Sequence, residues 1–407
     1  MGNDMTMDDF DPMKGYLAMA SAFAEPELAA ARASANPQPM YVELINTRPV
    51  REIGPGMVSV LRMDDILFIN KHHDVEQGSK FLGSSRPAIP LGLDGAEHRK
   101  YRRLLDPVFT AKKVAPLEES VRRLAHELID GFIDKGEVDA YHDWCEPLPS
   151  SIFLNIMGLP LEDLEAFTHF KNLTLGNDSD EYTYEEKDAR RLEAVEWIHN
   201  YFNASLDERE KEPEARPDMI GMLQTAEVDG ERLSREDTLD ILGLLMIAGL
   251  DTVAASLACF VSHFARHPDD RARIVADPSL IPSAVEELMR FESPVTDGNR
   301  IARADLELPS GAKIAKGTYM HICWASAAVD PNAFNDPLTI DFNRSPNPHI
   351  GFASGFHRCL GSHLARMEMR VALEVWHERI PNYSVKPGVE LHYTGNPRAP
   401  HVLPLVW

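Results

Sequence analysis

A glycine-rich loop near the end of the chain places a cysteine where a reactive thiolate is favoured. The loop reads Gly351-Phe352-Ala353-Ser354-Gly355-Phe356-His357-Arg358-Cys359-Leu360-Gly361, and an amphipathic helix is predicted to follow from Ser362 to about Glu378. Glycines allow such a loop to bend tightly, and the start of the helix presents unpaired N–H groups and a positive dipole to an anion. A thiolate is stabilised there and is a strong axial donor to haem iron. An isolated cysteine is usually a small buried residue, but the whole pattern favours an iron ligand over that alternative.

A long predicted helix from Arg235 to Arg266 carries a second chemical signal. Near its middle lies the segment Ala248-Gly249-Leu250-Asp251-Thr252. Glycine weakens a helix, and a threonine hydroxyl can bond to the carbonyl four residues earlier, so this segment can open locally for a small ligand. Heterolytic cleavage of an O–O bond needs protons delivered into a dry pocket, for which an acid and a hydroxyl are suited. The alternative is a kinked core helix with a buried aspartate.

From about Asp94 onward, the sequence resembles the cytochrome P450 superfamily, and the Cys359 loop is the most specific signature. The resemblance implies a mainly α (α+β) fold in which residues 1–407 form one domain, a large helical part with a smaller β-rich region. It also implies haem b as the cofactor. Cys359 is then the iron ligand, with Thr252 bonded to the oxygen being activated and Asp251 relaying protons from solvent.

Further cofactor contacts are implied by the same resemblance. Phe352 is expected to pack near the haem and the thiolate, and His98, Arg102, Arg300 and His357 are expected to hold the haem propionates by charge-assisted bonds. The remaining expected contacts are with the loop glycines and with the helix segment over the other haem face: Gly355, Gly361, Ala248 and Gly249. For His98 and Arg102, which share one helix face, a solvated basic surface is the alternative.

Glu287 and Arg290 lie three residues apart on a predicted helix, which alone suggests an ordinary surface ion pair. In the family this pair is a buried structural clamp completed by a later arginine. The downstream segment from Asp330 to Arg344 matches the family's pattern, but Val329 stands where many members have arginine, so the third member stays open.

An external electron donor is expected. No flavin or nicotinamide fingerprint of the GxGxxG kind follows a strand, and by resemblance to soluble bacterial members the donor is a ferredoxin with its own NAD(P)H-dependent reductase. On a chain of net charge −23, a basic island near the thiolate could steer such an acidic carrier. Its expected members are Arg99, Lys100, Arg103, Lys112, Lys113 and Arg358. The same net charge disfavours nucleic acid as a partner.

The expected substrate is small and mostly apolar, such as a terpenoid, a steroid or a branched aliphatic or fatty acid. The resemblance implies a pocket lined by Ile89, Leu91, Leu244, Leu245, Ala248, Val295, Thr296 and Pro397. These side chains offer a dry, shape-selective cavity. Arg86 could bind a carboxylate at the mouth of this pocket, or be a solvated loop residue.

Three functional classes stay open at this stage. A monooxygenase using O2 is favoured because Asp251 and Thr252 are both present. A peroxide-driven peroxygenase or haem-thiolate isomerase is the alternative. The third class is a non-catalytic haem sensor, which is disfavoured because we expect the chain to leave no room for an output domain.

Composition and periodicity complete these expectations. The chain has 44% hydrophobic residues, an Asp-rich start and four scattered cysteines. No apolar stretch is expected to reach the ~18 residues that span a bilayer. We therefore expect a cytoplasmic protein, and we expect it to be a monomer. Strands are predicted at Met57–Arg62 and Ile66–Asn70 as a hairpin, at Ile301–Leu308, at Thr318–Cys323 and at Val402–Trp407. The predicted helices are His98–Leu105, Leu117–Lys135, Ser151–Met157, Leu161–Leu173, Tyr184–Glu210, Arg235–Arg266, Ile281–Phe291 and Ser362 to about Glu378. A mobile lid is predicted between Leu173 and Tyr184.

Overall fold

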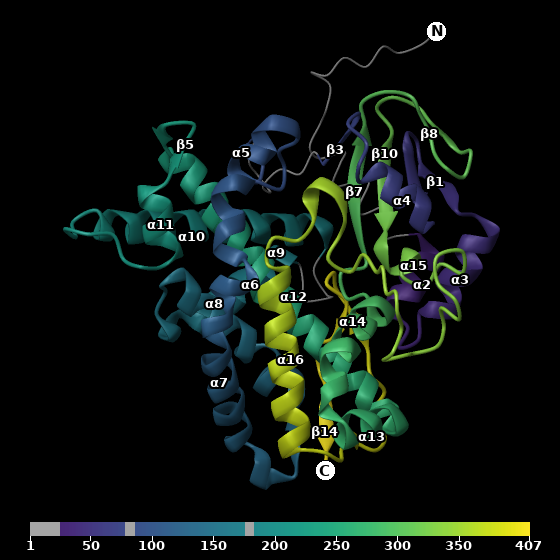
Figure 1. Cartoon of the computed structure of the whole chain (residues 1–407). Coiled ribbons are helices and arrows are strands. Elements are labelled where there is room, and N and C mark those ends of the chain that lie inside the picture. Colours follow the sequence, from purple (N-terminus) through teal and green to yellow (C-terminus); the bar gives the residue numbers. More distant parts are fainter. Residues whose placement is uncertain (1–24, 78–85, 176–182) are drawn as a thin grey trace.

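Helices make up most of the molecule (Figure 1). The computed structural model describes residues 25–77, 86–175 and 183–407; the expected lid falls largely outside these residues. The helices are α2 (Pro26–Ala33), α3 (Gln38–Thr47), α4 (Met63–Ile69), α5 (Gly95–Leu105), α6 (Ala111–Val114), α7 (Glu118–Asp130), α8 (Pro147–Met157), α9 (Leu164–Leu175), α10 (Tyr184–Arg209), α11 (Met219–Thr225), α12 (Arg235–Arg266), α13 (Pro268–Ala276), α14 (Ile281–Glu292), α15 (Trp324–Ala327) and α16 (Ser362–Arg379).

A β-rich region lies to one side of the helices (Figure 1). Its main sheet has the order β1 (Val50–Gly54), β2 (Met57–Val60), β10 (Tyr319–Cys323), β7 (Asp297–Ala302) and β3 (Val75–Glu76). Strands β2 and β10 are parallel, with Met57 opposite Tyr319, and the other pairs are antiparallel. The smaller sheets use β4 (Glu137–Asp139), β5 (Glu227–Val228), β6 (Glu231–Arg232), β8 (Leu306–Glu307), β9 (Lys313–Ile314), β11 (Ser384–Val385), β12 (Tyr393–Thr394), β13 (Ala399–Pro400) and β14 (Pro404–Val406).

Helix α12 runs through the helical part and packs against α8, α9, α10, α14 and α16. Its start is capped by the Ser234 hydroxyl, which accepts from the Asp237 N–H. The expectation that no segment would be apolar enough to span a membrane is wrong by composition, because an 18-residue window of α12 has a mean hydropathy of 2.1. Since 72% of that window is buried inside the protein, its apolar character is used for core packing.

The predicted strand at Ile66–Asn70 is wrong, because residues Met63–Ile69 form helix α4. Met63, Ile66 and Ile69 recur every three residues and are all buried, which is helical spacing. Asp64 and Asp65 lie in the first turn, where the helix dipole favours acidic side chains. The apolar run from Ile66 to Ile69 is so short that it fits both the two-residue period of a strand and the 3.6-residue period of a helix. The predicted strand at Ile301–Leu308 is also divided between β7 and β8.

The Glu287–Arg290 pair is a buried clamp, and Arg344 is its third member. Arg290 donates to both carboxylate oxygens of Glu287 at 2.7 and 2.8 Å, and Arg344 Nε lies 3.1 Å from each of them. Both arginines also donate to the Thr339 carbonyl. The clamp therefore fixes the long irregular segment before the Cys359 loop onto α14.

Replacing Arg344 with methionine should lower the free energy of unfolding by about 3 kcal/mol, because it removes one cation from the buried Glu287 carboxylate. The measurement is urea unfolding of the holoenzyme followed by circular dichroism. Arg379→Met is the matched control, since Arg379 pairs with the exposed Asp130 and should cost at most about 1 kcal/mol. Equal losses in the two variants would contradict a structural role for the clamp.

Candidate active site

The Cys359 loop is shaped by a close approach to α4. The Cys359 N–H donates to the Phe352 carbonyl at 2.8 Å, which folds the loop back on itself. Gly355 has φ +69°, and a Cβ there would lie 2.1 Å from the Asn70 carbonyl oxygen, so only glycine fits. A Cβ at Gly361 would meet nothing within 4 Å, so protein packing does not explain that glycine.

Cys359 is the exposed member of the four cysteines, while Cys145, Cys259 and Cys323 are buried. Its thiol is nevertheless surrounded closely enough that desolvation raises its pKa, while the Gly361 N–H and three arginines oppose that rise: Arg102, Arg366 and Arg358. The sulfur is thus accessible, close to cations and next to a helix N-terminus. This donor set fits a thiolate ligand to a metal centre.

An accessible patch interrupts the otherwise buried helix α12. Between Thr238 and Ala265, every residue is buried except Leu244, Ile247, Ala248, Gly249 and Thr252. Leu244, Ala248 and Thr252 follow one another at four-residue spacing on one face, and Ala248 is exposed in the middle of the helix. A core helix that leaves this face open, packed on the helix that follows Cys359, fits a bound planar cofactor.

The α12 segment stays helical throughout. The Thr252 hydroxyl donates to the Ala248 carbonyl at 2.9 Å, as its sequence position predicted. A Cβ at Gly249 would lie 2.5 Å from the Phe153 ring of α8, so this glycine is required by helix packing.

Asp251 points away from solvent into a buried ionic network that the sequence did not reveal. Its Oδ1 lies 3.1 Å from Lys171 Nζ on α9 and accepts from the Tyr141 hydroxyl at 3.3 Å, while Oδ2 has no hydrogen-bond partner among the residues that the structure describes. Lys171 also donates to Glu146 at 2.5 Å, and Glu146 lies 3.7 Å from the half-exposed His142. These residues come from separate elements, so no local pattern could have identified them.

The electrostatics of this network are mutually stabilising. Burial lowers the pKa of Lys171, but the attraction of Asp251 and Glu146 outweighs it and the pKa ends above its usual value. Burial raises the pKa of Glu146, yet hydrogen bonding to His142 and the charge of Lys171 bring it below normal. The hydrogen bond to Glu146 raises the pKa of His142. A chain of titratable side chains therefore connects the surface with the α12 segment.

The four expected propionate ligands form one group of basic side chains. The rings of His98 and His357 are 4.3 Å apart, and Arg102 donates to the Arg358 carbonyl in the Cys359 loop. Burial, together with His357 and Arg102, lowers the pKa of His98 to about 4. Arg300 is buried and has no ion-pair partner in the described ranges, and desolvation lowers its pKa to about 10. The buried Arg300 guanidinium and the basic side chains near it fit a cofactor that carries carboxylates.

Asp94 joins this group although sequence reasoning did not select it. Its Oδ1 bonds to His357 Nε2 at 2.8 Å, and its Oδ2 accepts from the Gln77 N–H. Burial raises the pKa of this carboxyl, but its bonds to His357 and Gln77 dominate and hold it below the usual value. Asp94 therefore neutralises part of the group, and so does Asp106, whose Oδ1 accepts from Arg102 Nε at 2.7 Å.

The expected substrate-contacting residues are only partly brought together. The Thr296 N–H donates to the Asn396 side chain at 3.3 Å, which joins the Val295–Thr296 segment to Pro397. Leu244 and Ala248 lie on the accessible patch of α12, whereas Leu245 and Ile89 are buried in the main core. Leu91 and Val295 are partly exposed. Substrate contact by these residues stays a prediction.

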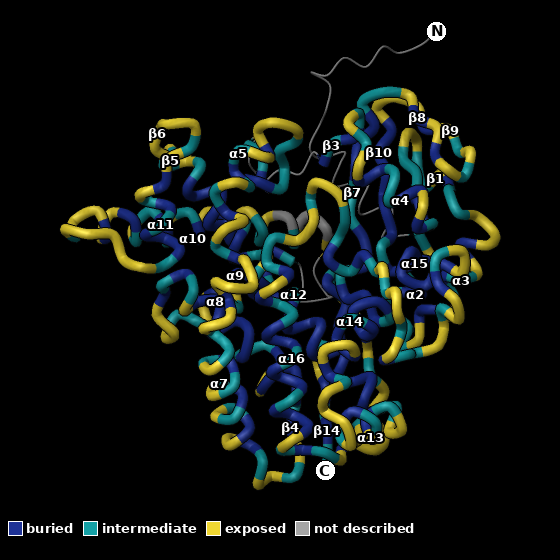
Figure 2. Tube along the Cα trace, viewed as in Figure 1, coloured by how far each residue is buried: buried dark blue, intermediate teal, exposed yellow. Residues whose placement is uncertain are grey.

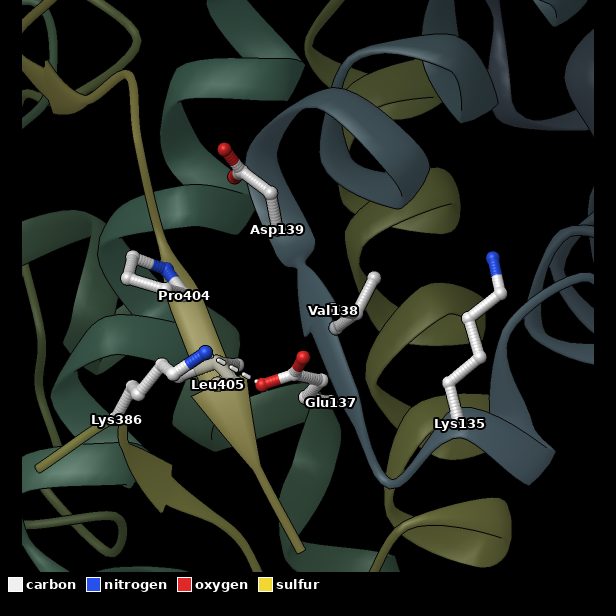
Figure 3. A pocket seen from close by; sticks show the side chains of 7 residues that line it. All are labelled: Lys135, Glu137, Val138, Asp139, Lys386, Pro404 and Leu405. Carbon is white, nitrogen blue, oxygen red and sulfur yellow. Dashed lines mark hydrogen bonds and ion pairs between the residues drawn. The ribbon is translucent and has the colours of Figure 1, made fainter.

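A surface pocket beside β4 and β14 is unrelated to this site. Figure 3 shows it lined by Lys135, Glu137, Val138, Asp139, Lys386, Pro404 and Leu405, with an ion pair between Lys386 and Glu137. None of these residues belongs to the cysteine loop, the cation group or the α12 patch.

Comparisons with known proteins agree with this geometry. Residues 166–387 match the cytochrome P450 family model. The chain is 32% identical to the methyl-branched lipid omega-hydroxylase of Mycobacterium tuberculosis (strain ATCC 25618 / H37Rv) over 81% of this chain and 79% of that protein. It is also 32% identical to the mycinamicin IV hydroxylase/epoxidase of Micromonospora griseorubida, over 90% and 94% of the two chains.

A solved structure of similar fold is CYP109E1 from Bacillus megaterium in complex with testosterone, with a TM-score of 0.83, 26% identity and coverage of 91% of this chain and 97% of that one. The chain belongs to the cytochrome P450 family. It is a haem-containing monooxygenase, and its mainly helical fold with a small β-rich region is the fold of that family.

Replacing Lys171 with methionine should lower the free energy of unfolding by about 3 to 5 kcal/mol, because Asp251 would remain buried without its cation. Urea unfolding of the holoenzyme measures this loss. In the control Lys386→Met, the exposed partner Glu137 stays hydrated, and the loss should be at most about 1 kcal/mol. A stable Lys171→Met protein would show that the Lys171–Asp251 ion pair does not hold α9 to α12.

Proposed function

We propose that Cys359 supplies the thiolate ligand of the haem iron in a monooxygenase that acts on a small, mostly apolar substrate. The observation that carries this proposal is the coincidence of an accessible cysteine at the start of α16 with the one open face of α12. When bound, a thiolate-ligated haem supplies the chemistry that activates O2 and cleaves its O–O bond. The protein's own groups must then hold the haem, exclude water and deliver protons.

His98, Arg102, Arg300 and His357 hold the haem propionates. Their mutual repulsion and the burial of Arg300 are relieved when two carboxylates enter the group. Phe352, Gly355 and Gly361 shape the thiolate side, since Phe352 accepts the Cys359 N–H and Gly355 permits the close approach to Asn70. Ala248 presents a small side chain on the opposite face, and Gly249 lets α12 lie close to α8.

Asp251 and Thr252 deliver protons to the reacting oxygen. The Thr252 hydroxyl lies on the open face of α12, and Asp251 is linked through Lys171 and Glu146 to His142, whose side chain is 55% exposed. Breaking the Lys171 contact would free the Asp251 carboxylate to exchange protons between this network and the site. The intact acid and hydroxyl favour an O2-dependent monooxygenase over a peroxygenase or an isomerase.

The substrate is a terpenoid, steroid or branched aliphatic compound. The open part of α12 exposes only Leu244, Ile247, Ala248, Gly249 and Thr252, so apolar contact dominates that wall. The names of the relatives also support a bulky apolar substrate: a methyl-branched lipid hydroxylase, a mycinamicin hydroxylase and a steroid C26-monooxygenase.

The electron donor is a ferredoxin that binds a basic surface around the Cys359 loop in the cytoplasm. Helices α5 and α6 adjoin this loop, because Arg102 donates to the Arg358 carbonyl and α6 packs on α16. Exposed basic side chains there are Arg99, Arg103, Lys112, Lys113 and Arg358. Lys100 and Arg103 are partly neutralised by Asp229. Phe356, which is 56% exposed, adds an apolar contact in the same loop.

Replacing Cys359 with serine should abolish the red-shifted Soret band of the reduced carbon monoxide complex, because that band requires a thiolate ligand. The measurement is the difference spectrum after dithionite reduction. Cys259→Ser is the control, since its hydroxyl can replace the thiol that donates to the Arg398 carbonyl, and it should keep the band. A normal band in Cys359→Ser would assign the iron to another residue.

Reversing two charges with Lys112→Glu and Lys113→Glu should slow ferredoxin association about tenfold at low salt, since electrostatic steering depends on the local field. Stopped-flow reduction by ferredoxin as a function of salt measures this effect. The control reverses Lys313 and Lys316, which are exposed in and beside β9, and changes the net charge equally. Equal slowing in both double variants would locate the docking surface elsewhere.

A further inference from the structure

The two ends of the Cys359 loop are joined by one carboxylate of α14. Glu286 Oε2 lies 2.9 Å from His349 Nε2, and the Glu286 oxygens accept from Arg366 Nε and its second terminal nitrogen at 2.6 and 2.9 Å. His349 precedes the loop, and Arg366 lies one turn into α16, which follows the loop and packs on α14. Glu286 therefore holds the loop from both sides.

The charge of Glu286 is fixed by these bonds. The Gly351 N–H donates to His349 Nδ1 at 3.2 Å, so the proton at Nε2 is the one donated to Glu286. Burial raises the pKa of the Glu286 carboxyl, but the bonds from His349 and Arg366 outweigh that effect and bring the pKa to about 2. Glu286 is therefore an anion at neutral pH, and its pairing with Arg366 is an ion pair.

Arg366 also covers the residue that folds the loop around the sulfur. Its Cζ lies 4.1 Å from the centre of the Phe352 ring, which is within the range of a cation–π contact. Phe352 is buried, and its carbonyl accepts the Cys359 N–H at 2.8 Å. The remaining terminal nitrogen of Arg366 donates to the Ser362 carbonyl in the first turn of α16 at 3.4 Å. The guanidinium is therefore held in one position beside the cysteine.

A charge in this position affects the haem through its sulfur ligand. Reduction of a thiolate-ligated haem adds one negative charge, so a nearby cation stabilises the reduced form and a nearby anion destabilises it. Burial raises the pKa of the Cys359 thiol, and the charge of Arg366 is one of the effects that oppose this rise. The side chains of Arg366 and Glu286 are only 28% and 31% exposed, so solvent screens their charges incompletely.

We propose that Arg366 is a positioning residue for the thiolate and that the Glu286–Arg366 ion pair sets the reduction potential of the haem. Arg366 covers the Phe352 ring and brings a positive charge to the sulfur, while Glu286 holds the guanidinium in place and offsets part of its charge. The inference rests on the proposed function, because it takes Cys359 as the iron ligand. A contact between α14 and α16 thus controls how readily the haem accepts its first electron.

The test is a dye-equilibrated dithionite titration of the substrate-free holoenzyme, which measures the reduction potential without substrate or ferredoxin. Arg366→Met removes the cation and should lower the equilibrium constant for reduction about tenfold, or ~59 mV for one electron. Glu286→Gln removes the anion and should raise that constant about threefold. The double variant removes one charge of each sign and should return to within about threefold of the wild type.

Two further variants separate the local charge from other effects. Arg370→Met is the matched control, because Arg370 lies one turn later on α16, is 26% exposed and pairs with Glu118 and Glu374. It should leave the equilibrium constant within about twofold of the wild type. Arg366→Lys keeps the charge without the planar guanidinium, and it should recover most of the loss seen with methionine.

The outcomes distinguish this proposal from the proposed function. An unchanged constant in Arg366→Met, or equal lowering in Arg366→Met and Arg370→Met, would overturn the role of the ion pair. Lowering in Glu286→Gln as well would also overturn it, because a loosened loop and not charge would then set the potential. Absence of the red-shifted carbon monoxide band in the wild-type protein would instead overturn the proposed function. Each variant is titrated once its spectrum shows that band, and Arg366→Gln replaces Arg366→Met if the latter lacks it.

Discussion

The burial of α12 is the constraint on which the other elements depend. A helix of 32 residues with so apolar a middle must be covered along its length, and α8, α9, α10, α14 and α16 provide that cover. Figure 2 shows the centre of the molecule, where these helices meet, as largely buried. The covering is incomplete at one place only along the buried stretch, around Ala248, and that place is where the chemistry is proposed.

Three buried ionic contacts at the boundaries of this centre join separate elements. The Glu287–Arg290–Arg344 clamp joins α14 to the segment before the cysteine loop. Lys171 joins α9 to Asp251 of α12, and Arg86 joins the segment before α5 to Asp240 of α12. Buried ion pairs add little net stability compared with apolar packing, but breaking one is costly. These ion pairs therefore fix the relative positions of the elements that they join. Arg300, by contrast, is buried without an ion-pair partner in the described ranges, and its charge is available to an anionic cofactor.

The sequence predicted the helices well where their apolar spacing was long and regular. Helix α12 has the predicted bounds of Arg235 and Arg266. The seven-residue helix α4 was misread as a strand because a run as short as Ile66 to Ile69 fits both periods. The sequence limited the third member of the clamp to the segment from Asp330 to Arg344. Only the tertiary structure showed that the Arg344 guanidinium contacts Glu287.

By itself, the sequence determined the family, the cysteine loop, the Asp251–Thr252 pair and the expected cofactor, because each depends on residue types at short, fixed spacing. The tertiary structure decided which groups surround them. Glu146, Lys171 and Asp251 are separated by 25 and 80 residues along the chain, and Arg86 and Asp240 by 154. Contacts at such separations depend on how whole helices pack, and no local pattern of charge or hydrophobicity records that packing. The ionic network of Asp251, Lys171 and Glu146 and the Arg86–Asp240 ion pair therefore became visible only in the folded chain.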